Sequence, residues 1–341
     1  MQPRFLIARM SAIGDTILTL PVACALRERF PTAHIVWAVE KGASSMVLGH
    51  PAVDQVIVLQ RGWFASPSQI LAARKLLRAQ HIDIAIDCQS ITKTSLACWL
   101  SGARTRIGLQ GKYGCEASPW LNNLLVTPKL PHLTDRSLEL LQPLGIQRPR
   151  VRWQFPLTGQ HRETAATLVQ QLGYRDRFAV VNPGATWDSK LWEMDRFGLV
   201  AQHLGRRHQV PTAVVWGNDR EREWADQIVR HSDGWATLAP RTSLLELAAF
   251  IERASLFISS DTGPLHMAVA VGTPCIGLHG TTRPADSGAY GAPHISLQAR
   301  FHDGSRRERR RADNAAMREL TTTMVTEATD RLFSPGHRMA G

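Results

Sequence analysis

The sequence predicts an α/β protein made of two doubly wound domains, each with a parallel β-sheet covered by helices. Three observations support this: short apolar runs alternate with longer helical stretches, the alternation restarts near the middle of the chain, and polar loops follow several of the runs. Such alternation is typical of parallel sheets with crossover helices. The 341 residues also exceed what one hydrophobic core usually holds, so we expect two domains.

The individual elements follow from the same pattern. In the first half, strands are expected at residues 4–8, 34–39, 55–59 and 83–87, with amphipathic helices at 15–30 and 67–80. In the second half, a helix over 161–173 precedes strands at 178–181, 212–216, 256–259 and 274–278, and a final helix covers about 316–333. Pro149, Pro156 and Gly159 interrupt the pattern between the halves. We therefore place an N-terminal domain at 1–158, a C-terminal domain at 159–315 and a closing segment at 316–341.

Composition excludes several classes of protein. No apolar run approaches the roughly 20 residues of a membrane-spanning helix. The first apolar run is interrupted by Arg9, too soon for a signal peptide. The cysteines form no CxxC pair, which favours reduced thiols buried in the core; they are Cys24, Cys88, Cys98, Cys115 and Cys275. The chain also has no Asp-x-Asp motif and no His, Cys and Asp cluster with ligand spacing, so we expect no metal and no cofactor.

The charge is unevenly distributed along the chain. The net charge of +11 divides into 18 Lys and Arg against 9 Asp and Glu in residues 1–160, and 22 against 20 in residues 161–341. A basic first half favours an anionic partner: a phosphorylated acceptor, an anionic membrane or nucleic acid. No nucleic-acid-binding module accompanies the charge, so we expect no nucleic acid. The arginine run at 306–311 is interpreted as a solvated loop, with an interaction patch as the alternative.

A polar loop follows the first expected strand. In parallel sheets, ligands bind beyond the carboxyl ends of the strands, so this loop should border a binding site. It contains a single glycine, Gly14, and so does not form a dinucleotide-binding fingerprint. Asp15 begins the next helix, where it serves either as a cap or dipole partner or as a catalytic carboxylate. The loop alone leaves both roles open.

Polar loops in the second half occupy equivalent positions. After the strand at 178–181, Gly184 and Thr186 offer donors to a phosphate, and Lys190 offers a point charge. After the strand at 256–259, a helix is expected to begin near Pro264, and its free N–H groups suit a diphosphate.

Two carboxylates in these loops need a separate explanation. Asp261 would repel a phosphate, so we expect it to fix the turn or to hold Lys190 or His266. Glu221 is a candidate for binding ribose hydroxyls, with Asp219 and Glu223 as rivals.

Taken together, these loops resemble glycosyltransferase family 9, the ADP-heptose lipopolysaccharide heptosyltransferases. The resemblance covers nearly the whole chain. It rests on Ser11-Ala12-Ile13-Gly14-Asp15 with Leu20-Pro21, Asp87-Cys88-Gln89 with Lys93, Asp188-Ser189-Lys190-Leu191-Trp192, Trp216-Gly217, Asp261-Thr262-Gly263-Pro264-Leu265-His266, and Gly280-Thr281-Thr282-Arg283-Pro284 with Gly291. The sequence departs from the first heptosyltransferase type of the family at Ala185, where that type has a second threonine. The aromatic and basic stretch near 61–75 is also thinner, and the run at 306–311 is unfamiliar.

The resemblance implies a GT-B fold, with two Rossmann-like domains facing a central cleft, and an inverting, metal-independent transfer of heptose. The donor would be ADP-L-glycero-β-D-manno-heptose and the acceptor an anionic, lipid-linked Kdo-lipid A or heptose of the lipopolysaccharide inner core. The enzyme would be a cytoplasmic monomer, peripheral on the inner membrane, whose closing helix returns to the first domain. The rival interpretations are a GT-B transferase or epimerase for another nucleotide sugar, and a non-catalytic nucleotide- or glycan-binding protein.

The resemblance also assigns roles to single residues. Asp15 would be the general base, and Lys190 would act in catalysis as well as in binding the donor. The other donor-binding residues would be Thr186 and Lys190 at the phosphates, Glu221 at the ribose, and Asp261, Thr262, Gly263 and His266 at the diphosphate turn. For the acceptor, the first domain offers Ser11, Gly14, Arg61, Lys93 and Lys112.

Overall fold

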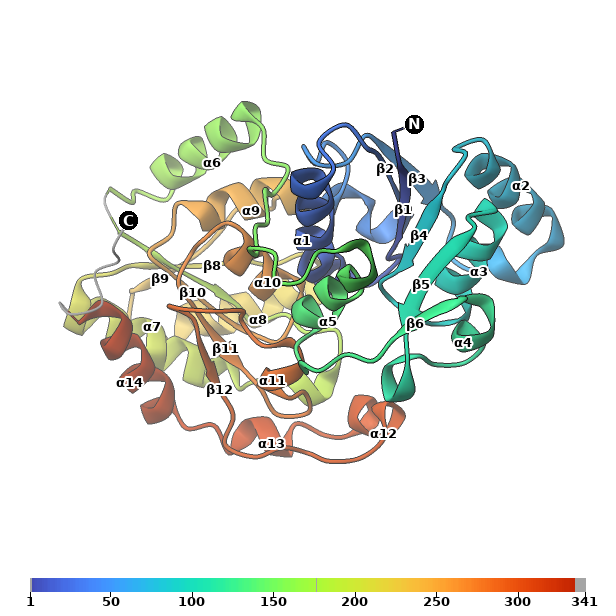
Figure 1. Cartoon of the computed structure of the whole chain (residues 1–341). Helices are drawn as coiled ribbons and strands as arrows, with labels where there is room; N and C mark the ends of the chain where they lie inside the picture. Colours follow the sequence, from blue (N-terminus) through green and yellow to red (C-terminus); the bar gives the residue numbers. More distant parts are fainter. Residues whose placement is uncertain (1, 176, 335–341) are drawn as a thin grey trace. The chain divides into compact units, whose positions relative to one another are not determined.

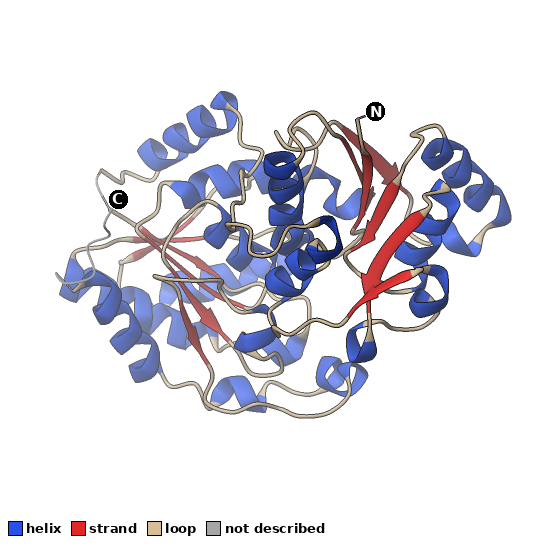
Figure 2. Cartoon of the chain, in the orientation of Figure 1, coloured by secondary structure: helices blue, strands red, loops and turns tan. Residues whose placement is uncertain are grey.

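The computed structural model describes residues 2–175 and 177–334, and it divides the chain into two compact units between Pro156 and Leu157 (Figure 1). The expected boundary between the domains was 158–159. In each unit, a sheet of parallel strands lies between helices on both of its faces (Figure 2). No helix within the described residues is long and apolar enough to cross a membrane.

The first unit contains a six-stranded parallel sheet in the order β3-β2-β1-β4-β5-β6. Its strands are β1 Arg4–Ala8, β2 His34–Glu40, β3 Gln55–Leu59, β4 Ile84–Asp87, β5 Thr105–Leu109 and β6 Leu124–Val126. Its α-helices are α1 Ile13–Arg29, α2 Pro67–Arg78, α3 Thr92–Ser101, α4 Ser118–Leu121 and α5 Leu133–Glu139. Short 3₁₀ helices occur at η1 Lys41–Met46, η2 Trp63–Ala65, η3 Gly111–Tyr113 and η4 Gln142–Leu144.

The second unit repeats this arrangement, with the strand order β12-β11-β10-β7-β8-β9. Its strands are β7 Ala179–Asn182, β8 Thr212–Val214, β9 Ala236–Leu238, β10 Leu256–Ser260, β11 Cys275–Leu278 and β12 Ile295–Leu297. Its helices are α6 Gly159–Gln171, η5 Asp188–Lys190, α7 Met194–His208, α8 Asp219–Arg230, α9 Leu244–Glu252, α10 Gly263–Ala270, α11 Pro284–Ser287, α12 Arg306–Arg311, α13 Ala315–Arg318 and α14 Thr322–Phe333.

The strand order determines where each unit can bind a ligand. In the first sheet, the connections run in opposite directions from β1 and β4, which lie side by side. The equivalent pair in the second sheet is β7 and β10. Ligands of doubly wound sheets bind beyond the carboxyl ends of strands at such a switch point. The loops that carry Asp15, Lys190 and Asp261 follow β1, β7 and β10, and Asp87 ends β4, whereas the loop that leads to Glu221 follows β8.

All eight expected strands are present, but four further strands were not predicted: β5, β6, β9 and β12. Three of these have only three residues, too few for a clear apolar pattern. The expectation that the helix over 15–30 is amphipathic was wrong, because α1 is buried almost throughout, including Thr16 and Thr19. The first helix is therefore a core element.

Three other expectations also need correction. The run at 306–311 is a short helix rather than a loop, and Ser305 and Glu308 form a capping box at its start. The final helix is interrupted after Arg318, and α14 begins anew with Thr321 as its N-cap. Cys115 is exposed, whereas the other four cysteines are buried.

Within the second unit, α14 packs against α7, β11 and β12 (Figure 1). The hydrophobic core beneath it includes Val325 and Ala328 of α14 and Val200 and Leu204 of α7. These contacts hold the last described helix on the second unit. The expected return of the closing segment toward the first domain stays a prediction.

Candidate active site

The loop after β1 places Asp15 beside a buried arginine. The Oδ2 atom of Asp15 lies 2.6 Å from Nη2 of Arg9, whose side chain is 6% exposed, against 35% for Asp15. Arg9 in turn donates from Nη1 to the Cys88 carbonyl at 2.9 Å, which ties it to the loop after β4. The Ala12 N–H lies 3.5 Å from Asp15 Oδ2 and contributes a weak capping contact. Arg9 therefore orients a carboxylate that still reaches solvent.

Lys93 lies at the same switch point, but it is not a free cation. Its Nζ contacts Glu40 Oε1 at 2.7 Å and the Ser11 hydroxyl at 2.9 Å. Both members of the pair are largely buried, at 13% and 12% exposure. The charge that the sequence offered to an acceptor is thus balanced by Glu40 at the end of β2. Gly14 is buried in the first turn of α1.

The other two predicted acceptor cations are exposed. Arg61 precedes η2, and Lys112 lies in η3 with its Nζ 4.9 Å from the centre of the Tyr113 ring. The three cations predicted to bind the acceptor therefore lie in different environments. Two are surface cations, and one belongs to a buried ion pair.

Asp87, at the end of β4, organises the neighbouring loop. Its Oδ1 accepts hydrogen bonds from the backbone of Gln89 and Ser90, and its Oδ2 accepts one from Asn122 Nδ2 at 3.0 Å. Burial raises the pKa of this carboxyl, despite the hydrogen bonds that oppose the shift. Gln89 accepts a hydrogen bond from the Met10 N–H at 3.2 Å, which links the two loops of the switch point. The Asp87-Cys88-Gln89 motif is thus a scaffold for the loop that carries Asp15.

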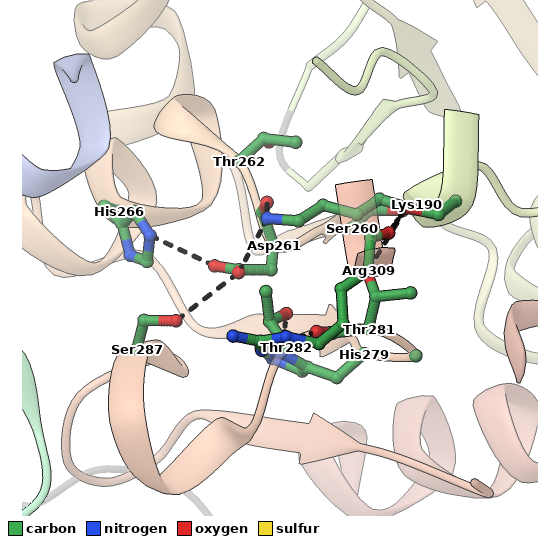
Figure 3. Close-up of polar contacts among 12 residues, drawn as sticks. Lys190, Ser260, Asp261, Thr262, His266, His279, Thr281, Thr282, Ser287 and Arg309 are labelled. Carbon is green, nitrogen blue, oxygen red and sulfur yellow. Dashed lines mark hydrogen bonds and ion pairs between the residues drawn. The ribbon is translucent and has the colours of Figure 1, made fainter. Parts of the chain in front are cut away.

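In the second unit, a lysine, an aspartate and a histidine meet between the loops after β7 and β10 (Figure 3). Lys190 Nζ lies 2.9 Å from both Oδ2 and the backbone carbonyl of Asp261. His266 Nε2 lies 3.3 Å from the other carboxylate oxygen of Asp261. The expectation that Asp261 holds Lys190 or His266 is confirmed, and Asp261 holds both.

Electrostatics in this cluster keep Asp261 ionised. Burial would raise its pKa, but Lys190 and the His266 hydrogen bond outweigh this effect and hold the pKa well below its usual range. His279, next to the cluster in Figure 3, responds in the opposite direction. Burial lowers the pKa of His279 to about 4, although the negative charge of Asp261 opposes the shift. At neutral pH, Asp261 is therefore a carboxylate and His279 an uncharged imidazole.

The turn before α10 is ordered by its own polar side chains. Asn182, at the end of β7, donates to the Ser259 hydroxyl at 2.9 Å, and the hydroxyls of Ser259 and Thr262 lie 3.1 Å apart. Thr262 is the N-cap residue of α10, yet its side chain accepts no capping hydrogen bond. The first N–H groups of α10, beginning at Gly263, thus receive no cap from the Thr262 side chain. Free N–H groups at a helix start bind anions.

The loop after β8 brings Glu221 beside the loop after β7. Glu221 Oε2 accepts a hydrogen bond from the Gly217 N–H at 2.7 Å. A Cβ atom on Gly184 would lie 2.7 Å from the carboxyl carbon of Glu221, so a larger residue there would displace this carboxylate. The rivals Asp219 and Glu223 are both exposed, whereas Glu221 is half-buried. Thr186, in the same loop as Gly184, is exposed.

Sequence reasoning missed several residues of the two clusters. Arg9, Glu40 and His279 directly follow or end a buried strand, which is the signal that revealed Asp15 and Asp261. Ser287 of α11 lies 3.4 Å from Asp261 Oδ2, and Arg309 of α12 donates to the Thr281 carbonyl at 2.9 Å (Figure 3). The last two come from distant elements, and no local pattern marks them.

The fold and these clusters define a class of protein. Two Rossmann-like units of one strand order, with an oriented carboxylate at one switch point and an uncapped helix start beside a lysine at the other, characterise a GT-B glycosyltransferase. A glycosyl transferase family 9 structure from Veillonella parvula has a TM-score of 0.84 at 23% identity over 97% of each chain. The E. coli heptosyltransferase WaaC with ADP-2-deoxy-2-fluoro heptose has a TM-score of 0.75 at 23% identity over 96% of this chain and 99% of that chain.

Sequence comparison identifies the family. The model of glycosyltransferase family 9 (heptosyltransferase) matches residues 70–315. The chain is 29% identical over 302 residues to lipopolysaccharide heptosyltransferase 1 of Salmonella typhimurium, which covers 84% of this chain and 92% of the relative. Because the family model matches most of the sequence, the chain belongs to glycosyltransferase family 9 and is a glycosyltransferase.

Proposed function

We propose that this enzyme transfers heptose from ADP-L-glycero-β-D-manno-heptose to an anionic lipopolysaccharide inner-core acceptor, either Kdo-lipid A or a heptose already attached to it. The observation that carries the donor half of the proposal is the cluster of Lys190, Asp261 and His266 beside the uncapped start of α10. The names of the relatives support heptose as the sugar and lipopolysaccharide as the acceptor. Thr186 and Thr262 would add hydroxyl donors to the diphosphate, and Glu221 would accept hydrogen bonds from the ribose.

In the proposed reaction, Asp15 removes the proton from the acceptor hydroxyl. The hydroxyl oxygen then forms a bond to the anomeric carbon of heptose, and the bond from that carbon to the β-phosphate oxygen breaks. A single displacement inverts the anomeric configuration. ADP leaves with the electron pair of the broken bond, and Lys190 and the N–H groups of α10 stabilise its new negative charge. Arg9 keeps the Asp15 carboxylate in place during this step.

The positive charge of Lys190 at the donor site is already paired with a carboxylate. Lys190 is bound to Asp261 at 2.9 Å, so a diphosphate must compete with a carboxylate or displace it. The start of α10 receives no capping hydrogen bond from the side chain of its N-cap residue, Thr262. We therefore assign the larger share of ground-state phosphate binding to the helix start. Lys190 then contributes most when negative charge develops on the leaving group, so the chemistry needs no metal ion.

The test is transfer and donor selectivity measured together. Purified enzyme is incubated with ADP-heptose and Kdo-lipid A, and the release of ADP and the glycosylated lipid are both quantified. UDP- and GDP-sugars serve as competing donors, and each donor is also tested without acceptor. Transfer dependent on both ADP-heptose and the lipid is expected. Isomerisation of a nucleotide sugar without acceptor would instead support an epimerase, and donor-dependent thermal protection without turnover would support a binding protein.

We further propose that a monomer of the enzyme works at the cytoplasmic face of the inner membrane, attached through its first unit. Eight of the nine exposed large hydrophobic side chains among the described residues lie in that unit. They include Trp120 at 85% exposure, Leu71 at 63% and Trp99 at 52%. Tryptophan favours the membrane–water interface, and basic residues are attracted to anionic lipids.

The helix α2 has the composition that such a surface needs. It exposes Leu71 and Leu76 together with Arg74, Lys75 and Arg78, and it contains no acidic residue. It packs beside α3, which carries Trp99, and α3 packs beside α4, which carries Trp120. We define the membrane-facing surface by the exposed side chains of these three helices. Apolar and basic side chains on one surface favour reversible attachment to an anionic bilayer.

A further inference from the structure

We propose that His203, His208 and Asp330 form a zinc-binding site that fastens α14 to α7. His203 and His208 lie in the last two turns of α7, and Asp330 lies in α14, 122 residues further along the chain than His208. Their ligand atoms all lie within 4.8 Å of one another. No role in the transfer reaction is assigned to these residues.

Both imidazoles point the same nitrogen at the same oxygen. Nε2 of His203 lies 2.8 Å from Asp330 Oδ1, and Nε2 of His208 lies 2.6 Å from that atom. A carboxylate needs only one imidazole to join two helices, whereas two imidazoles and a carboxylate supply three of the four ligands of a tetrahedral ion. Two nitrogens and an oxygen are donors that zinc accepts. The cluster therefore has the chemistry of a metal site as well as that of an ion pair.

The ligands are already close to the geometry that zinc requires. With bonds of about 2.0–2.1 Å, neighbouring ligands of a tetrahedral zinc ion lie about 3.3 Å apart. The observed separations from Asp330 are 2.8 and 2.6 Å, so these two contacts have to lengthen by about 0.5 and 0.7 Å. A small rotation of the Asp330 side chain, which is 38% exposed, would provide this lengthening. Water would be the fourth ligand.

Packing around the cluster holds one ligand in place. The ring of His208 stacks on Phe333 of α14, with the ring centres 5.0 Å apart and the planes at 29°. The side chain of His208 is 16% exposed and that of His203 is 26% exposed. Because the folded chain already positions both imidazoles, binding of zinc requires little further ordering. Preorganised ligands favour a site that is filled in the native state only.

The charges near the cluster set a limit on its affinity. Arg206 is paired with Asp233, whereas Arg207 is exposed in the same turn of α7. The guanidinium of Arg177 lies 5.7 Å from the centre of the Phe333 ring. These cations oppose binding of a divalent ion. We therefore expect the site to bind zinc less tightly than a cysteine-rich structural site, and the ion pair to persist when zinc is removed.

The position of the cluster makes its role structural. Lys190 precedes α7, whereas the two histidines lie toward the other end of that helix. A helix of 15 residues extends about 22 Å. Zinc bound at the cluster would thus be remote from the donor cluster and would act by joining α14 to α7. Removal of zinc should lower the melting temperature without abolishing transfer.

The experiment is a zinc titration of the full chain. The protein is stripped with EDTA, desalted, and titrated with ZnCl₂ at pH 7.5 in competition with a chelating dye. We expect one equivalent of zinc to bind, and His203→Ala, His208→Ala and Asp330→Ala each to lose at least tenfold in affinity. His231→Ala is the matched control, because His231 is exposed in the same unit outside the cluster, and this variant should bind zinc normally.

Two further measurements keep the proposal testable if a variant folds poorly. X-ray absorption of the wild-type protein with one equivalent of zinc should show two imidazole nitrogens and no sulfur among the ligands. The melting temperature of the wild type should rise with zinc, and that of His203→Gln should not. Sulfur ligands would place the ion on a cysteine and overturn the assignment. A variant in which His203, His208 and Asp330 are all replaced by alanine serves as the reference. If the wild type binds zinc no more tightly than this variant, the cluster is an ion pair only.

Discussion

Asp15 interacts with both the Arg9 guanidinium and the Ala12 amide, so a substitution that tests its role in catalysis should keep its size. We predict that Asp15→Asn lowers kcat by about 10²–10⁴-fold, the usual contribution of a general base. Donor affinity should stay close to that of the wild type, because Asp15 lies in the first unit and the donor cluster in the second. Turnover and donor binding are measured on the same preparation. More than a tenth of wild-type kcat would make Asp15 a structural partner of Arg9.

Lys190 is predicted to affect turnover and stability together. In Lys190→Ala, loss of a charged hydrogen bond of roughly 1.5–3 kcal/mol should lower kcat and raise KM. The substitution also leaves Asp261 buried and without its main counter-charge, which typically destabilises by about 3–5 kcal/mol. The double variant Lys190→Ala with Asp261→Asn should recover stability but not turnover. Wild-type kcat in Lys190→Ala with only a raised KM would argue against a role in the transition state.

The pKa of His279 predicts how the stability of the folded protein changes as the pH falls. Its pKa is about 4 in the folded protein against 6.5 for an unperturbed histidine. As pH falls through this interval, the unfolded chain binds a proton that the folded chain does not, so stability decreases by about 3 kcal/mol. Melting curves between pH 7 and pH 4 should therefore show a smaller decrease for His279→Asn than for the wild type. An identical slope would mean that His279 is protonated in the folded state.

Single residues also show how far the sequence could lead. The polar residues after strands were predictable because parallel strands end at one edge of the sheet, and Asp15, Lys190 and Asp261 were found in this way. Their partners were harder to predict. Arg9 appeared to interrupt an apolar run, and Glu40 appeared to end one. The pairing of Lys93 with Glu40 could not be predicted, because it depends on β1 lying between β2 and β4 in the sheet.

At the scale of elements, helix α2 leads to a prediction about the membrane. Replacing Leu71 and Leu76 with serine should reduce sedimentation with anionic vesicles several-fold, because burial of a leucine contributes roughly 1.5–3 kcal/mol. Several tenths molar NaCl should release the wild type, since salt at that strength screens surface charges over a few ångströms. Leu199→Ser in α7 of the second unit, also exposed, is the matched control and should bind normally.

Assays with a lipid-linked acceptor distinguish attachment of the first unit to the membrane from its binding of the acceptor. The double serine variant should transfer heptose normally to a detergent-dispersed acceptor and poorly to acceptor in vesicles. Charge reversal of Arg61 and Lys112 should weaken use of the acceptor more than binding of the donor. Loss of donor affinity in that variant would mean that the two units have been assigned to the wrong substrates. Lys93 is left out because its reversal would place two negative charges in a buried pair.

Elements differed in how well the sequence predicted them. Strands within long apolar runs were found, whereas β5, β6, β9 and β12 were missed; β5 has polar residues in its first half, and the other three have only three residues each. The arginine run looked like a loop because six charged residues offer no apolar face. In the structure, Ser305 caps it, and Arg309 turns inward to the Thr281 carbonyl. Tertiary contacts therefore decided its conformation.

At the scale of the whole molecule, the proposed chemistry and the proposed zinc site make different predictions for a chelator. EDTA should leave the rate of heptose transfer unchanged at 25 °C, since Lys190 and the start of α10 supply the positive charge. It should lower the melting temperature if zinc is bound at His203, His208 and Asp330. Activity lost in EDTA and restored by Mg²⁺ or Mn²⁺ would contradict the metal-independent mechanism. Both properties are measured on one sample with and without the chelator.

The repetition of one strand order in both units has a consequence for how the two substrate preferences can change. Each unit builds its own sheet, core and switch point, and the division between them falls at a single place in the chain, between Pro156 and Leu157. A mutation that alters one switch point therefore leaves the covalent framework of the other untouched. Under the proposed function, acceptor choice and donor choice are separate heritable traits. A hybrid joined at that peptide bond should take its donor from one parent and its acceptor from the other.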